Sequence, residues 1–382
     1  MQAPEEVVKD LEQAELSLTA LSVIGAFIRA LDTDYGHLFS PLDLSLAKHL
    51  YFTAIRADPQ FIRHRLVDAF NLTPYGFQSW FFDKTVKPGY DVHMVGRKKL
   101  VRDTIEQAIE DGAKHIIVLG GGYDPQAFLA AQGHTEVKFY ELDRGATRSI
   151  KISALQNLPD DFPIAPPTVS KLNDNAVEFN DNFVCLECDF ISDDLEKLLT
   201  TCGYNKDEKT LVIAEGLTMY LTLPQIQQVM ASLRQLFSED SQFLVSFIPF
   251  LAKTGSIHKA AINSSKEEYK ASLKPEEIIG FAEEQGFQVK GKLFGEMIQI
   301  ALGNHYAVEC EKKNPKLGKE NYYLLQPDPR QEGIKSIDEV PNLTLNIPRK
   351  KEEVEEVEEV EEVEEIIEQE DSVLEAWSCS LQ

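Results

Sequence analysis

The stretch IIVLGGGYDP, residues 116–125, decides the fold class of this chain. An apolar run leads directly into Gly120, Gly121 and Gly122, a pattern typical of a buried strand followed by a tight turn that lets a ligand approach the backbone. Asp124 follows and can cap a helix beginning at the next proline, because proline at the first helical position loses no hydrogen bond. The segment predicts strand, turn and helix, with a ligand site or a bare turn as the two interpretations.

Strand-like and helix-like segments alternate on the C-terminal side of this turn. Apolar runs predict six further strands, at 137–142, 183–186, 211–214, 243–248, 287–294 and 305–311. The segments between most of these runs are long enough for helices. Alternation of this kind predicts an α/β fold, with a parallel sheet covered by helices on both faces.

Composition divides the chain into four parts. Residues 1–95 are mostly helical in pattern, 96–315 form the α/β domain, 316–351 read as a polar linker, and 352–382 are an acidic tail. The valines of the tail recur every three residues, a spacing that spirals round a helix and forms no apolar stripe. We expect a solvated tail, and a docking segment for a basic partner is the alternative.

The charge of the chain excludes several classes of function. The net charge is −25, and residues 352–371 hold 13 acids and no Lys or Arg. Without a basic face there is no footprint for nucleic acid, and an anionic membrane would repel the tail. Five dispersed cysteines favour a reducing cytoplasm, and the acidic N-terminus argues against a signal peptide. We therefore expect a cytoplasmic globular protein that binds neither nucleic acid nor membrane.

The second predicted strand ends in two acids, Glu141 and Asp143. They follow the glycines by about 20 residues, the distance at which a carboxylate meets the two hydroxyls of a ribose in open α/β sheets. Acids also cap strand ends where no ligand binds. Asp143 is our preferred ribose ligand, and Glu141 is held in reserve.

The third and fourth predicted strands also end in polar residues. Cys188, Asp189 and Phe190 follow the third, so that an acid beside an aromatic ring could bind an adenine, and Glu215 and Gly216 follow the fourth. Ligands of open α/β sheets bind beyond the carboxyl ends of the strands. Four such ends together predict a nucleoside-containing ligand. The acid of the glycine turn disfavours a pyrophosphate, whereas a cofactor with a sulfonium and an ammonium group tolerates it.

Five blocks of the sequence resemble the leucine carboxyl methyltransferase family, which includes bacterial polyketide O-methyltransferases of the tetracenomycin type. The blocks are ELSLTALSVIGAFIRAL at 15–31, GRKKLVRD at 96–103, IIVLGGGYD at 116–124, FYELD at 139–143 and LVIAEGLTMYL at 211–221. The last is the most specific. The resemblance extends from residue 15 to 312 and leaves the acidic tail unmatched.

This resemblance implies a class I methyltransferase, with a Rossmann-like seven-stranded sheet, an N-terminal helical lid and S-adenosylmethionine as cofactor. By position it implies that Arg97 binds the methionine carboxylate, Gly120 and Gly122 line its chain, Asp143 holds the ribose, Asp189 the adenine, and Glu215 the ammonium. The chain departs from the family where Asp-Thr-Arg after the glycines becomes Asp124-Pro125-Gln126, and where Asp-x-Pro after the second strand becomes Asp143-Arg144-Gly145. The first departure removes an arginine that could structure the site.

The residues available for catalysis favour a carboxylate as methyl acceptor, on a small molecule or a peptide end. An ionised acid needs no general base, whereas a phenol or alcohol does, and no convincing His or Lys base follows the strands. Tyr220 is the candidate for the acceptor pocket, although a packed tyrosine explains it equally well. Arg56, Arg63 and Arg65 could hold the acceptor acid or be solvated.

Other interpretations stay open. Cys185-x-x-Cys188 resembles half of a zinc site, but no second pair follows, and we expect no metal. An NAD-dependent oxidoreductase is disfavoured by the missing third glycine of the dinucleotide fingerprint. A noncatalytic module that binds the cofactor, or displays the acidic tail to a partner, is the alternative from another class.

Overall fold

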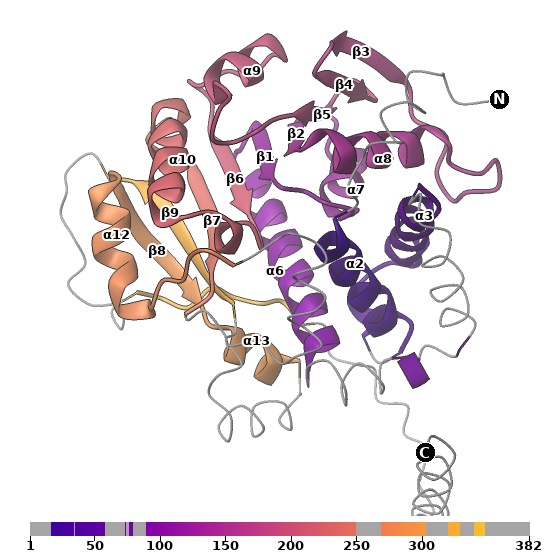
Figure 1. Ribbon diagram of the computed structural model, residues 1–382, viewed down its shortest axis with the longest axis horizontal. Helices are drawn as coiled ribbons and strands as arrows, with labels where there is room; N and C mark the ends of the chain where they lie inside the picture. The colour runs from indigo at the N-terminus through magenta and orange to yellow at the C-terminus, as the bar shows by residue number, and fades with distance from the viewer. Residues whose placement is uncertain are drawn as a thin grey trace, which may run out of the picture. The chain divides into compact units, whose positions relative to one another are not determined.

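The computed structural model describes residues 17–33, 35–57, 73, 76–78, 89–249, 269–302, 320–328 and 340–347. These residues form a nine-stranded sheet in the order β3-β4-β5-β2-β1-β6-β7-β9-β8 (Figure 1). Its parallel centre consists of β1 (His115–Leu119), β2 (Lys138–Asp143), β5 (Phe183–Glu187), β6 (Thr210–Ala214) and β7 (Gln242–Phe247). All five are strands that the sequence predicts, and the predicted α/β class is confirmed.

The sheet closes differently from the sequence-based expectation. Strand β8 (Phe287–Leu293) lies at the edge, and β9 (Asn321–Pro327) runs antiparallel between β7 and β8. The last strand was expected at 305–311, which lies outside the described residues, and 321–327 fell in the predicted linker. Strand β9 has a neighbouring strand on each side. Its sequence nevertheless lies in a polar stretch, where only the short apolar run YYLL marks it. The domain boundary near 315 is therefore wrong.

Chain beyond β9 also packs on this domain. The amide of Lys292 donates to Pro341 O at 2.9 Å, and the amide of Leu343 donates to Lys292 O at 2.7 Å, which covers the edge of β8. Leu345 and Ile347 pack against the core. At the opposite edge, β3 (Val169–Asn173) and β4 (Ala176–Phe179) form a hairpin that the sequence did not predict. The sheet therefore has nine strands in place of the expected seven.

Helices cover both faces of the sheet (Figure 1). One core contains α2 (Leu18–Leu31), α3 (Pro41–Ala57), α6 (Tyr90–Glu110), α7 (Gln126–Gly133), α8 (Gly145–Gln156) and Ile298 of α13 (Gly295–Ala301). The other contains α9 (Leu195–Thr201), α10 (Leu223–Leu236) and α12 (Ile278–Glu284). Short 3₁₀ turns lie at Gly36–Leu38, Thr218–Tyr220 and Pro275–Glu277. Neighbouring strand residues such as Ile116 and Ile117 enter opposite cores, as the alternation of a strand requires.

Two buried acids fix the N-terminal helices to the domain. Asp91 of α6 accepts two hydrogen bonds from Arg29 of α2, at 2.9 and 2.8 Å. Asp43, near the start of α3, accepts from Arg102 of α6 and, at 3.2 Å, from Gln126 of α7. The helical pattern predicted for this part of the chain is present in α2 and α3, which lie against α6 and α8 (Figure 1).

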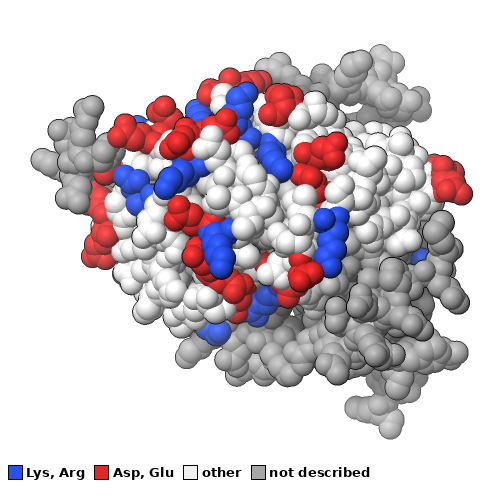
Figure 2. All heavy atoms as spheres, turned by 90° about the horizontal axis from the view of Figure 1, so that it is seen from above, with Lys and Arg blue, Asp and Glu red and all other residues white. Residues whose placement is uncertain are grey.

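The surface and the helices limit what the described part of the chain can contact. On the face in Figure 2, basic and acidic side chains are interspersed. No described helix combines the length and the apolar composition that crossing a membrane requires. Arg63, Arg65 and the acidic tail lie outside the described residues.

Candidate functional site

The glycine turn follows β1 as predicted, and each of its glycines has a steric reason. Gly120 and Gly122 have φ angles of +69° and +56°, in the left-handed region that side chains disfavour. A Cβ at Gly121 would overlap the side chain of Glu141. A Cβ at Gly122 would come 3.4 Å from Ala20 at the start of α2. The turn is therefore packed between the sheet and the N-terminal helices.

Asp124 combines the predicted capping role with an ion pair. Its Oδ1 accepts from the amide of Gln126 at 3.0 Å, at the start of α7. Its Oδ2 lies 2.7 Å from Nζ of Lys98. Burial alone would raise the pKa of Asp124, but the ammonium of Lys98 lowers it, so this carboxylate is ionised.

The two acids of β2 have different surroundings. Asp143 accepts from the amides of Gly122 at 2.8 Å and Arg144 at 2.7 Å, which places its carboxylate beside the glycine turn. Glu141 is 4% exposed, and both of its oxygens lie 2.6 Å from Nζ of Lys151. Burial raises the pKa of Glu141 to about 7. The structure therefore places Asp143 beside the glycine turn and Glu141 beneath the turn.

The segment after β5 meets the end of β2. The amide of Cys188 donates to the carbonyl of Asp143 at 3.0 Å, and the side chain of Cys188 is buried. Asp189 is exposed, and its Oδ1 accepts from the amide of Ile191 at 2.9 Å. Phe190 is partly buried against the second core. The three residues thus lie at the same edge of the sheet as the glycine turn.

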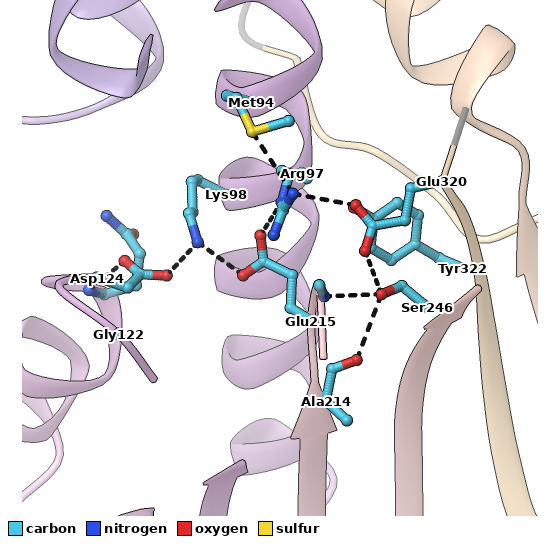
Figure 3. Close-up of polar contacts among 12 residues, drawn as sticks. Met94, Arg97, Lys98, Gly122, Asp124, Ala214, Glu215, Ser246, Glu320 and Tyr322 are labelled. Carbon is cyan, nitrogen blue, oxygen red and sulfur yellow. Dashed lines mark hydrogen bonds and ion pairs between the residues drawn. The ribbon is translucent and has the colours of Figure 1, made fainter. Parts of the chain in front are cut away.

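A buried network of charges joins α6 to the ends of β1 and β6 (Figure 3). Arg97 donates from Nε to Oε1 of Glu215, and Lys98 donates from Nζ to Oε2 of Glu215 at 2.8 Å. Lys98 also reaches Asp124, so one ammonium bridges acids from two strand ends. The side chains of Arg97 and Glu215 are only 8% and 7% exposed.

A second carboxylate holds Arg97 from the other side. Nη1 of Arg97 lies 3.0 Å from Oε2 of Glu320, just before β9. Tyr322 donates to the same oxygen at 2.9 Å, and Ser246 at the end of β7 donates to Oε1. Burial raises the pKa of Glu320, but the guanidinium of Arg97 outweighs burial and keeps this pKa well below its usual range.

Gly216 makes room for this arginine. Its φ angle is +67°, and a Cβ there would come 2.5 Å from Nη2 of Arg97. Its amide donates to the hydroxyl of Ser246 at 2.9 Å. Tyr220 follows in a 3₁₀ turn, with its ring edge against Tyr269 at a centroid distance of 5.5 Å. Burial raises the pKa of Tyr269 to about 12, so this phenol is uncharged at neutral pH.

Residues 59–234 match the sequence model of the leucine carboxyl methyltransferase family. The matched segment is slightly shorter than half of the chain, and this part of the chain is similar to that family. The resemblance predicted from the sequence is confirmed for this segment.

One protein similar to this chain is a protein of Frankia alni named, provisionally, an S-adenosyl-L-methionine-dependent methyltransferase. The two are 22% identical over 201 residues, which cover 52% of this chain and 62% of the relative. The match therefore spans less than two thirds of that relative's length.

Solved structures similar to this chain include two methyltransferases with a bound cofactor or product. Magnesium protoporphyrin IX methyltransferase from Synechocystis, with S-adenosylhomocysteine, is 13% identical, with a TM-score of 0.37, and the match covers 70% of this chain and 100% of that one. Human N-acetylserotonin methyltransferase, with S-adenosylmethionine, is 12% identical, with a TM-score of 0.36, and the match covers 76% and 72%.

Sequence reasoning missed four residues of the buried charged network. Lys98 adjoins Arg97 in the GRKK block, and that adjacency was an available signal. Ser246 lies inside a predicted strand, and Glu320 and Tyr322 belong to the segment expected to be a linker. Nothing in their local sequence links these three to Arg97, which lies more than 100 residues away in the chain.

The described cysteines are buried and pack as apolar residues. Cys185 and Cys188 belong to different cores, on opposite faces of the sheet. Burial raises the pKa of both thiols, that of Cys188 to about 12, so neither is ionised at neutral pH. Among the described residues, no group of three His, Cys, Asp or Glu side chains is arranged to bind a metal ion.

Proposed function

We propose that this chain is an S-adenosylmethionine-dependent O-methyltransferase that binds its cofactor across the carboxyl ends of β1, β2, β5 and β6. The observation that carries the proposal is the buried Arg97–Glu215 pair beside the glycine turn. The amino-acid group of the cofactor has one carboxylate and one ammonium, and this pair is complementary to both. Arg97 would bind the carboxylate, and Glu215 would bind the ammonium.

Charge balance supports this assignment. Burying a charged ligand is costly unless each charge finds a partner. When a zwitterion enters between Arg97 and Glu215, two ion pairs with the ligand replace the one ion pair between these residues. The net charge of the site does not change. Lys98 remains bound to Asp124 throughout, which keeps the acid of the glycine turn neutralised.

The nucleoside would lie over the ends of β2 and β5. The carboxylate of Asp143 accepts one backbone hydrogen bond on each oxygen, and each oxygen retains capacity for a ribose hydroxyl. The amide of Gly122 fixes the direction of that carboxylate. Asp189 and Phe190 are the residues that we assign to the adenine, and the left-handed glycines let the cofactor chain approach the backbone.

Bound S-adenosylmethionine supplies an activated methyl group on a sulfonium centre. The protein must align an acceptor oxygen with that methyl group and exclude water. Tyr220 follows Glu215 in the chain and packs against Tyr269, and the raised pKa of Tyr269 makes it a poor base at neutral pH. A carboxylate acceptor, on a small molecule or a peptide end, fits this environment because it is already ionised and needs no base.

Calorimetric titration tests the cofactor assignment. We expect saturable binding of S-adenosylhomocysteine and no binding of NAD, because Asp124 occupies the position where a pyrophosphate needs donors. Binding of NAD alone would support an oxidoreductase. Binding of the homocysteine derivative without methyl transfer to any acceptor would support a noncatalytic module.

The acceptor is tested with cofactor labelled in its methyl group. Incubation of the protein with a cell extract should give labelled products that release methanol in mild base, as methyl esters do. Label that survives this treatment as an ether or an amine would contradict the carboxylate assignment.

A further inference from the structure

Arg97 binds two carboxylates that occupy opposite sides of its guanidinium (Figure 3). Glu215 accepts from Nε on the side of the glycine turn, and Glu320 lies 3.0 Å from Nη1 on the side of β9. The first carboxylate is the one assigned to the ammonium of the cofactor. A ligand that engages Glu215 therefore removes one of the two anchors of the arginine.

Glu320 has no such competing role. Its side chain is 4% exposed, Tyr322 donates to Oε2 at 2.9 Å, and Ser246 donates to Oε1. Each carboxylate oxygen is thus fixed by a hydroxyl from β7 or β9, on the far side of Arg97 from Asp124 (Figure 3). The geometry makes Glu320 a stationary anion.

We propose that Glu320 is a positioning residue, which holds Arg97 in place for the carboxylate of the cofactor while Glu215 turns to the ammonium. Without it, the guanidinium would have Glu215 as its single carboxylate partner, and the pair would stay closed against the ligand. With it, Arg97 keeps a charged partner through Nη1 and presents its remaining donors beside Gly216. The inference rests on the proposed function and adds a residue outside the glycine turn and the strand-end acids.

Two ligands separate this role from a general effect on folding. S-adenosylhomocysteine has the amino-acid group, whereas 5′-methylthioadenosine has the same nucleoside and sulfur but neither the carboxylate nor the ammonium. For Glu320→Gln we expect the Kd of S-adenosylhomocysteine to rise about tenfold and that of methylthioadenosine to stay within about twofold. Equal losses for both ligands, or an unchanged or lower Kd for S-adenosylhomocysteine, would overturn the proposal.

Two further variants keep the test decisive. Tyr322→Phe removes one donor to Glu320 and keeps the charge, so it should raise the Kd of S-adenosylhomocysteine about threefold, with methylthioadenosine unchanged. If Glu320→Gln does not fold, Tyr322→Phe replaces it in the test. An unchanged ratio of the Kd of S-adenosylhomocysteine to that of methylthioadenosine would then overturn the proposal. Glu208→Gln is the matched control, because Glu208 binds His115 at 2.8 Å at the start of β1. Both constants should be unchanged in this control.

The two proposals fail in different ways. Wild-type protein that binds neither ligand contradicts the proposed function itself. Wild-type protein that binds S-adenosylhomocysteine more tightly than methylthioadenosine supports that function, and the ratio in Glu320→Gln then tests the positioning role alone.

Discussion

Two buried ion pairs adjoin the glycine turn, and they are built differently. Beneath the turn, Glu141 and Lys151 are 4% and 1% exposed, and Glu141 has Lys151 as its single cationic partner among the described residues. Beside the turn, Arg97 and Glu215 each have a second charged partner, Glu320 and Lys98. A ligand can replace one bond of the second pair without leaving a lone buried charge. The first pair is suited to structure, and the second to binding.

The largest effect should come from breaking the structural pair. We expect Lys151→Met to lower the free energy of unfolding by about 3 to 5 kcal/mol at pH 8, because it leaves the buried carboxylate of Glu141 without a counter-charge. Urea unfolding followed by circular dichroism measures this change. A variant of unchanged stability that no longer binds S-adenosylhomocysteine would instead assign this pair to cofactor binding.

Breaking the binding pair should affect affinity more than stability. We expect Glu215→Gln to weaken S-adenosylhomocysteine by about 2 kcal/mol, roughly thirtyfold in Kd, through the lost charge on the ammonium ligand. Arg97 keeps Glu320 and Lys98 keeps Asp124, so unfolding should change little. Calorimetry and urea unfolding on the same preparation measure both quantities. A large loss of stability with unchanged affinity would show that the two pairs are alike.

Asp143 tests the other acid of β2. We expect Asp143→Ala to weaken S-adenosylhomocysteine at least about tenfold, because charge-assisted bonds to two ribose hydroxyls are lost. The stability of the protein should fall less than in Lys151→Met. An unchanged affinity for S-adenosylhomocysteine in calorimetric titration would show that Asp143 does not bind the ribose.

The two buried glutamates should give opposite pH dependence of stability. Burial raises the pKa of Glu141 to about 7, so its contribution is greatest below its unfolded pKa of 4.5 and is lost as pH rises through 7. Burial raises the pKa of Glu320, but Arg97 outweighs burial and lowers it. The contribution of Glu320 to stability is therefore present above its unfolded pKa of 4.5 and is lost as pH falls.

Unfolding free energies measured from pH 3 to 8 test this contrast. Each group should contribute a slope of up to about 1.4 kcal/mol per pH unit in its own range. Glu141→Gln should remove the falling slope between 4.5 and 7, and Glu320→Gln the rising slope at lower pH. Removal of the same slope by both variants would show that the two carboxylates titrate as one group.

The smallest effect is expected from the acidic tail. Cutting the chain after Arg349 retains Leu343, Leu345 and Ile347, which pack against the core. The melting temperature and the affinity for S-adenosylhomocysteine should stay unchanged, because the valine spacing of the tail offers no apolar stripe. A fall of several degrees would show that the tail contributes to the fold.

The sequence by itself determined the class of fold and most of the site. Apolar runs with glycines or acids directly after them mark β1, β2, β5 and β6, and parallel strands bring such ends to one edge of a sheet. Asp124, Asp143, Asp189 and Glu215 could be placed there because their positions depend only on local spacing and this topology.

Only the tertiary structure distinguished Glu141 from Asp143 and brought Glu320 to Arg97. Both acids of β2 follow the glycines at a suitable distance, and packing alone shows that Lys151 closes one of them beneath the turn. Strand β9 enters the sheet between β7 and β8 from a segment whose composition resembles a linker. The contact of Glu320 with Arg97 joins positions far apart in the chain, and such a contact is set by strand order and burial, which leave no local pattern in the sequence.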